Sequence, residues 1–195
     1  MEIDPAEVDG SLYRTLSGSV VPRPIAWVST TSEDGVDNLA PFSFFTVAAI
    51  DPPILVFAPV DGPDGLKDTP RNVRDTGELV VNIVTDDTVE AMNQTAATLP
   101  ADESEFDQSG ASRAESTRVS PPRVAESPIA FECELYDLQD VGSSSLILAE
   151  VVYVHVADAV TTDSKVDVEK LDAVGRMAGS WYASTEDRFS LERPP

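Results

Sequence analysis

The 195-residue chain contains one cysteine, Cys133, and one histidine, His155. A single cysteine excludes an internal disulfide, a cysteine-built zinc site and an iron–sulfur cluster held by this chain alone. A single histidine excludes a metal centre with several histidine ligands, so we expect no metal site. Because Glu132 and Glu134 flank Cys133 and offer no cation to a thiolate, we expect this cysteine to be inert. His155 lies within the run VVYVHV and is interpreted as a sheet residue rather than a catalytic base.

Positive charge is also scarce. Thirteen Lys and Arg residues stand against 35 Asp and Glu residues, and the formal net charge is −22. So acidic a chain is a poor match for nucleic acid or an anionic membrane, since both attract clustered basic residues. The composition is typical of a halophilic protein, because concentrated salt screens the repulsion between carboxylates. An acidic face for a basic partner is the alternative, but the carboxylates are spread over most of the chain.

Long apolar runs are missing as well. The longest fall far short of the roughly 20 residues that cross a membrane. Residues 1–5 (MEIDP) show neither the positive nor the apolar region of a signal peptide, so we expect a cytoplasmic protein. Walker-type, Gly-x-Gly-x-x-Gly and Gly-x-Ser-x-Gly motifs are absent too, and none of these phosphate loops or serine nucleophiles is predicted.

Hydrophobic residues make up 42% of the chain, which is enough for a core. Close-spaced strands with only short helices favour an antiparallel barrel. Strands are predicted at about 25–31, 38–49, 54–58, 79–84, 129–138 and 146–157, and helices at 5–17, 66–77, 87–97 and 103–109. Pro41 requires a bulge or a sheet edge in its strand. We predict one domain over residues 1–195 with a long loop at about 99–128, the kind of loop that covers a site or an interface.

A candidate anion site lies at the start of the helix predicted at 66–77. Thr69 suits the N-cap, Pro70 the first helical position and Gly77 the C-terminal stop. Lys67 lies two residues before Thr69, and the first turn of a helix offers free N–H groups and a partial positive charge that favour phosphate. Taken alone, however, the segment is better explained as an ordinary capped surface helix.

The segment 38–45 (NLAPFSFF) shifts that balance, because small residues, a proline and aromatics leave room for a flat ligand against the backbone. With RPIAWVST at 23–30 and KDTPRN at 67–72, it resembles the flavin reductase-like family of FMN-binding split barrels, which includes the flavoredoxins. The resemblance runs from about residue 13 to residue 194. Further matches, in the same order, are 104–106 (SEF), 120–128 (SPPRVAESP), 132–133 (EC), 175–176 (GR), Gly179 and Tyr182.

The resemblance implies a mainly β protein: a six-stranded antiparallel split β-barrel with short flanking helices. It also implies a homodimer with FMN near the dimer interface. The stretches 27–30 and 38–44 would line the isoalloxazine and ribityl chain. Lys67, Thr69 and Asn72 would meet the phosphate, and Arg176 and Tyr182 would close the site. The cofactor-binding residues it assigns are Trp27, Val28, Ser29, Thr30, Asn38, Leu39, Ala40, Pro41, Ser43, Phe44, Lys67, Thr69, Asn72, Arg176 and Tyr182.

A bound flavin carries its own redox chemistry, and hydride transfer to it requires positioning rather than a protein acid or base. We therefore expect no catalytic side chain. The leading hypothesis is an NAD(P)H-dependent FMN reductase that takes NADH or NADPH as reductant. One alternative is an FMN electron-transfer protein reduced by another protein. Another is a non-catalytic dimeric barrel that binds FMN or a different ligand.

Overall fold

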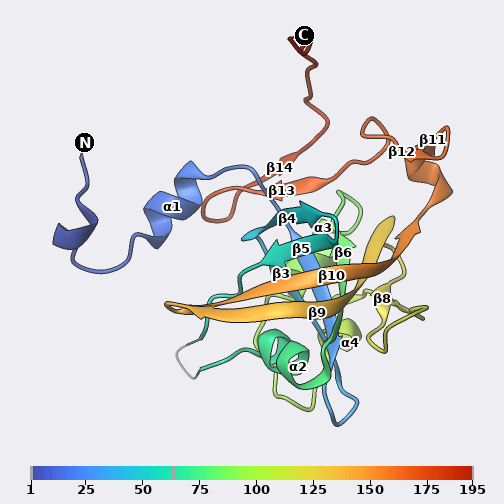
Figure 1. The fold of residues 1–195 in the computed structure, drawn as a ribbon, viewed down its shortest axis with the longest axis horizontal. Coiled ribbons are helices and arrows are strands. Elements are labelled where there is room, and N and C mark those ends of the chain that lie inside the picture. Colours follow the sequence, from blue (N-terminus) through green and yellow to red (C-terminus); the bar gives the residue numbers. More distant parts are fainter. Residues whose placement is uncertain (1, 63–64, 195) are drawn as a thin grey trace.

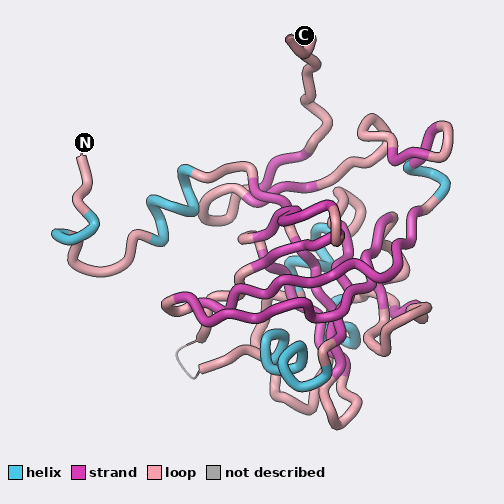
Figure 2. The backbone as a smooth tube through the Cα atoms, viewed as in Figure 1, coloured by secondary structure: helices cyan, strands magenta, loops and turns pink. Residues whose placement is uncertain are grey.

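The computed structural model describes residues 2–62 and 65–194 (Figure 1). Strands dominate it, and the helices are short (Figure 2). The main elements are α1 (Tyr13–Ser19), β1 (Arg23–Pro24), β2 (Ala26–Thr31), β3 (Asp37–Phe42), β4 (Phe45–Ile50), β5 (Pro53–Phe57), α2 (Asp68–Thr76), β6 (Glu78–Ile83), α3 (Val89–Gln94), α4 (Glu105–Ser109), β9 (Ile129–Val141), β10 (Ser144–Val156), β13 (Val174–Arg176) and β14 (Tyr182–Ser184). Smaller elements are the 3₁₀ turns η1 (Pro5–Glu7) and η2 (Asp158–Val160), and the short strands β7 (Arg113–Ala114), β8 (Arg123–Val124), β11 (Thr161–Thr162) and β12 (Lys165–Val166).

The main sheet is antiparallel throughout and has the strand order β3-β2-β6-β9-β10-β5-β4. Its two outer strands, β3 and β4, are consecutive in the chain and are separated only by Ser43 and Phe44. The β3 part pairs with β2 and the β4 part with β5, so one bent segment joins the two ends of the strand order. This is the closure of a split barrel.

The predicted mainly β, antiparallel barrel class is confirmed, but the strand count is not. The main sheet has seven strands where six were predicted, because the strand expected at 38–49 is bent and divides into β3 and β4. Pro41 lies in β3, at the end of the strand order, where β2 is the only neighbouring strand of the sheet. Its missing N–H therefore breaks no hydrogen bond to a second strand. The sheet edge required by this proline is therefore present.

The barrel strand β2 is buried on both faces. Side chains alternate between the faces of a strand, and here Ala26 and Val28 join the core inside the barrel. Trp27 belongs to a second core together with residues of α3 and α4. Two cores on one strand explain why this stretch of the sequence is apolar without alternation.

Helix α2 ends as predicted and starts differently. Gly77 is its C-cap with φ of +73°, the left-handed conformation that glycine adopts without strain. Its N-cap is Lys67 rather than Thr69, so its first helical residue is Asp68 instead of Pro70, two residues earlier than predicted. Asp68 then occupies the first turn, where a carboxylate favours the positive end of the helix dipole.

The other helices are shorter than predicted. The helix expected at 5–17 is replaced by η1 and α1, the one at 87–97 is reduced to α3, and the one at 103–109 begins at Glu105. The loop at 99–128 also contains the small two-stranded sheet β7–β8, which was not predicted. No helix within residues 2–62 and 65–194 is long and apolar enough to span a membrane.

The N-terminal arm and the C-terminal segment extend away from the barrel (Figure 1). Arg23 joins them at their base, because its buried guanidinium donates hydrogen bonds to the carbonyls of Ser17 (2.5 Å), Val20 (2.5 Å) and Met177 (3.0 Å). Strand β1 also pairs with β13. Helix α1 is thereby held beside the β13–β14 hairpin.

A buried carboxylate anchors the long loop to the barrel. Glu132 of β9 is fully buried and accepts the backbone N–H groups of Thr117 (2.7 Å), Arg118 (2.5 Å) and Val119 (3.3 Å). His155 of β10 places its Nε2 2.5 Å from Glu132 Oε1. His155 is thus a sheet residue, as expected, and its partner belongs to the loop anchor.

Cys133, next in the chain, points into the barrel core and is fully buried. Burial, with a smaller contribution from the charge of Glu132, raises the pKa of the Cys133 thiol far above its ordinary value. The thiol therefore stays protonated, in agreement with the expectation that this cysteine is inert.

Candidate functional site

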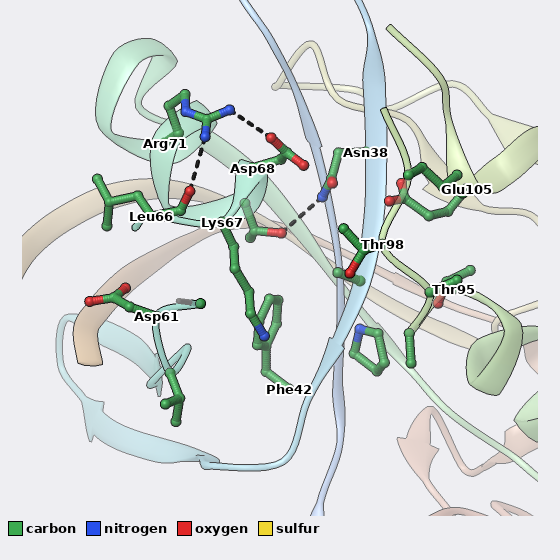
Figure 3. A pocket seen from close by; sticks show the side chains of 18 of the residues that line it. Asn38, Phe42, Asp61, Leu66, Lys67, Asp68, Arg71, Thr95, Thr98 and Glu105 are labelled. Atoms are coloured by element: carbon green, nitrogen blue, oxygen red, sulfur yellow. Dashed lines mark hydrogen bonds and ion pairs between the residues drawn. The ribbon is translucent and has the colours of Figure 1, made fainter. Parts of the chain in front are cut away.

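A cleft of about 780 Å³ opens beside the β3–β4 bend (Figure 3). Its walls come from β3 and the bend, the segment between β5 and α2, the start of α2, residues 95–99 after α3, and single residues of α1 and α4. The lining includes the side chains of Tyr13, Asn38, Ala40, Pro41, Phe42, Ser43, Phe44, Asp61, Lys67, Asp68, Thr69, Arg71, Thr95, Thr98 and Glu105.

One part of the cleft is polar and built on the first turn of α2. Lys67, Asp68 and Thr69 all line it. Asn38 of β3 donates from Nδ2 to the Thr69 hydroxyl oxygen at 2.8 Å, and both side chains are buried. Because the hydroxyl accepts this bond, its own proton remains available to the cleft. Within the described residues, no carboxylate forms an ion pair with Lys67.

A second amide–hydroxyl pair lies behind the first. Asn72 of α2 donates from Nδ2 to the Thr30 hydroxyl oxygen at 3.0 Å, and both residues are buried. Neither lines the cleft. The pair fixes α2 against β2 and so holds the first turn of the helix in place beside Asn38.

Arg71 lines the same end of the cleft but is already engaged. Its Nη1 lies 2.6 Å from Asp68 Oδ1, and its Nη2 donates to the Leu66 carbonyl at 2.9 Å (Figure 3). The pair is largely exposed and contributes little to stability. Lys67 therefore differs from Arg71: its side chain has no hydrogen-bond or ion-pair partner among the described residues.

Another wall of the cleft is apolar. It follows the β3–β4 bend and includes Ala40, Pro41 and Phe44. Tyr13 of α1 approaches Phe44 with ring centroids 6.3 Å apart. The guanidinium carbon of Arg23 lies 5.8 Å from the centroid of the Phe44 ring, and Arg23 Nε donates to Ser43 Oγ at 3.4 Å. The N-terminal arm thus contributes to the cleft.

A buried carboxylate lines the cleft near Asn38. Glu105 of α4 is 7% exposed, and its Oε2 accepts the backbone N–H of Leu39 at 2.9 Å. Burial raises the pKa of the Glu105 carboxyl; the hydrogen bonds from Leu39 and from its own backbone act against the shift, and the charge of Asp68 adds to it. The family resemblance includes Glu105 in the stretch 104–106 (SEF), but reasoning from sequence assigned it no role in the site.

Residues 17–169 match the sequence profile of the flavin reductase like domain. The chain belongs to this family. An uncharacterized protein from Halalkalibacterium halodurans is 41% identical over 189 residues, which cover 93% of this chain and 90% of that protein.

Two solved structures of high similarity support this assignment. Nitrilotriacetate monooxygenase component B from Bacillus cereus has a TM-score of 0.92 and 34% identity, with 98% of both chains covered. The 2-nitrobenzoate 2-nitroreductase of Pseudomonas fluorescens has a TM-score of 0.91 and 31% identity, covering 100% of this chain and 96% of that one.

The structure brings about half of the predicted cofactor residues of this flavin reductase-like chain into one cleft. Those that line it are Asn38, Ala40, Pro41, Ser43, Phe44, Lys67 and Thr69. The remaining ones lie outside its lining: Trp27, Val28, Ser29, Thr30, Leu39, Asn72, Arg176 and Tyr182. The clearest example is Trp27, whose Nε1 donates to the Thr95 hydroxyl oxygen at 2.9 Å, so this tryptophan supports the wall from behind.

The two tail residues form their own pair away from the cleft. The guanidinium of Arg176 lies 4.5 Å from the centroid of the Tyr182 ring and donates to the Gly179 carbonyl. The Tyr182 hydroxyl donates to Asn93 Oδ1 at 3.1 Å. Both residues belong to the β13–β14 hairpin, which lies beside α1 and therefore near the arm that reaches the cleft.

Proposed function

We propose that the protein is an FMN-binding flavin reductase that takes its electrons from NADH or NADPH. The observation that carries the proposal is the pairing, within one cleft, of a lysine-bearing helix start with an apolar wall. Lys67, Thr69 and the first turn of α2 suit a phosphate, and the backbone of the β3–β4 bend suits a planar ring.

The size and chemistry of the cleft fit such a cofactor. Its volume of about 780 Å³ lies within the range of small-molecule and cofactor sites. The ammonium of Lys67 and the hydroxyl of Thr69 would hold the phosphate, while Asn38 orients that hydroxyl. Asn72 and Thr30 would act one layer further back, by keeping the helix start in position.

The other assigned residues support the ring-binding wall. Ala40, Pro41, Ser43 and Phe44 would meet the flavin directly. Trp27, Val28, Ser29 and Leu39 lie in β2 and β3 beneath that wall and keep its backbone rigid. Bound flavin would supply the capacity to accept a hydride and to pass electrons on. The protein's part is to hold the ring with one face accessible and to exclude water from it.

We further propose that the chain acts as a single-domain homodimer. An exposed apolar strip along α1 and its C-cap supports this, with Tyr13, Leu16 and Val20 each more than half exposed. Trp181 in the adjoining hairpin is 75% exposed. An apolar surface of this kind marks a protein interface. Arg176 and Tyr182 would then close the cleft of a second copy, which accounts for their position away from the cleft of their own chain.

The proposal is tested by the spectrum of the protein as purified and by stopped-flow reduction. We expect a flavin absorbance spectrum, heat-released FMN, and bleaching of the flavin when NADH or NADPH is mixed in. If neither nucleotide bleaches a bound flavin but a reduced protein donor does, the protein is an electron carrier. A colourless protein that takes up no added FMN would refute flavin binding altogether.

A further inference from the structure

We infer that Glu105 is a ligand-binding residue of the cleft: its carboxylate accepts a hydrogen bond from an N–H or O–H donor on the uncharged part of the bound flavin. The inference rests on the proposed function, since it assumes a flavin in the cleft. It goes further by assigning the neutral part of the ligand to a side chain that neither the phosphate end nor the apolar wall explains.

The first support is the cost of the charge. Glu105 is 7% exposed, and within residues 2–62 and 65–194 no Lys, Arg or His forms an ion pair with it. A buried carboxylate without a cation is unfavourable unless several donors surround it. Among the residues that the structure describes, Leu39 supplies the only hydrogen bond to it from another residue. A carboxylate can accept about four, so this group has capacity to spare.

The second support is the edge of β3. Leu39 lies opposite Ser29 in the ladder with β2, yet its N–H turns to Glu105. Pro41, two residues on, would present the next N–H on the same edge but has none. Glu105 therefore accepts the hydrogen bond that the Leu39 N–H on this edge could have given to a ligand, and its carboxylate takes the place of that donor. An edge that would have offered a donor now offers acceptors.

The third support is the position of the charges in the cleft, where Asp61 and Asp68 also lie on the Lys67 side and Asp68 is paired with Arg71 (Figure 3). In Figure 3, Lys67 and Glu105 lie on opposite sides of Asn38. A phosphate is attracted to the first and repelled by the second, so the anionic end of a ligand belongs with Lys67. The part that meets Glu105 carries donors and no negative charge. In a flavin these donors are the imide N–H of the ring and the hydroxyls of the ribityl chain.

A role in structure alone does not require the charge. Glutamine in place of Glu105 keeps an oxygen for the Leu39 N–H and removes the buried carboxylate. The Glu105→Gln variant is therefore the sharp test, since it separates the structural hydrogen bond from the charged acceptor. Glu103→Gln is the matched control: Glu103 is an exposed acid in the same loop, hydrogen-bonded to Gln108 and outside the cleft lining.

We expect Glu105→Gln to weaken FMN and riboflavin binding by the same factor, about tenfold, in fluorescence titrations, and Glu103→Gln to leave both unchanged. The reduction potential of the bound flavin should rise, because reduction adds negative charge next to a group that is no longer anionic. Lumiflavin, which lacks the ribityl chain, distinguishes the donors: the same loss of affinity indicates the ring N–H, and no loss indicates a ribityl hydroxyl.

Two results would overturn the inference. Unchanged affinity and potential in Glu105→Gln would make the residue structural only, and tighter binding would show that the carboxylate repels the ligand. Both outcomes leave flavin binding by the wild type intact, so they are distinct from failure of the proposed function. If the wild type binds no flavin, the proposed function and this inference both fail.

Discussion

Two buried glutamates in this protein have opposite surroundings. Glu132 anchors the long loop and is met by three backbone N–H groups and by His155. Glu105 lines the cleft and is met by one N–H from another residue. Burial alone raises the pKa of both; at Glu132 the hydrogen bonds from His155 and the loop outweigh burial and lower it, whereas at Glu105 the pKa stays raised. The anion is therefore stabilised at the first site and destabilised at the second.

The difference separates a structural carboxylate from a functional one. A carboxylate with all its lone pairs occupied has nothing left for a ligand, and its charge contributes to folding. One that is buried, underused and directed to a cleft costs stability without a ligand. Since the chain has 35 acidic residues, this criterion distinguishes these two from the solvated majority.

The largest expected effect is at the loop anchor. Glu132→Gln places an amide NH₂ among N–H donors and leaves them unsatisfied, so we expect the free energy of unfolding to fall by about 3 kcal/mol at pH 7. Urea denaturation would measure this loss. The matched control is Glu134→Gln, two residues along β9 and exposed, which should not lower stability.

The same anchor predicts a pH dependence with a definite sign. Because the pKa of Glu132 is lowered in the folded state, its contribution is present above the unfolded pKa of about 4.3 and is lost as pH falls through the folded value. Proteolysis of the 99–128 loop should accelerate over the same acidic range. Equal stability of Glu132→Gln and the wild type at pH 7 would contradict the anchor.

The second effect concerns the cationic end of the cleft. Lys67→Ala removes a charge-assisted contact to the phosphate, so we expect FMN binding to weaken by about 2 kcal/mol and riboflavin binding to stay nearly unchanged. This selectivity contrasts with Glu105→Gln, which should affect both flavins alike. Lys170→Ala is the control, since its ammonium donates to the Thr161 carbonyl outside the cleft. Equal losses of affinity for FMN and riboflavin would show that Lys67 does not contact the phosphate.

The contrast between the two glutamates also shows what the sequence could and could not predict. The barrel class, the strand β2 and the stop of α2 at Gly77 followed from local patterns, because strand propensity and turn chemistry act over a few residues. The Asn38–Thr69 and Asn72–Thr30 pairs join residues 31 and 42 positions apart. No local pattern specifies such partners.

Burial was equally inaccessible from sequence. Glu105 and Glu132 lie in stretches that match the family, 104–106 and 132–133, but only the tertiary structure shows which donors surround each of them. The bend of β3–β4 depends on pairing with two different strands, so the count of seven could not be read from the 38–49 segment alone. The resemblance to a family supplied the cleft residues that local patterns could not.

The third effect is a gain in stability. Glu105→Gln removes an uncompensated buried charge and keeps the Leu39 hydrogen bond, so we expect the ligand-free protein to gain about 1 kcal/mol at pH 7. A raised pKa means that the neutral form is favoured in the fold, so the gain should shrink as pH falls through the folded pKa and be absent below the unfolded pKa. Thermal melts at pH 7 and pH 4 would show it. A loss of stability at pH 7 would mean that the carboxylate is satisfied after all.

The smallest effect concerns carboxylates that are solvated rather than buried. Glu134 lies directly opposite Glu78 on β6 and Glu150 on β10, which places three like charges in one row across the sheet. Like charges directly opposite each other are destabilising, so Glu134→Gln should raise stability by about 0.5 kcal/mol at low salt. In molar salt the Debye length falls to about 3 Å and this gain should vanish.

Over the same salt series the melting midpoint of the wild type should rise, since a net charge of −22 repels itself most when unscreened. Melts of both proteins and of Glu192→Gln, an exposed acid of the C-terminal segment, would separate the row from the total charge. A wild-type midpoint that is flat or falls with salt would remove the halophilic interpretation, whatever the variant does.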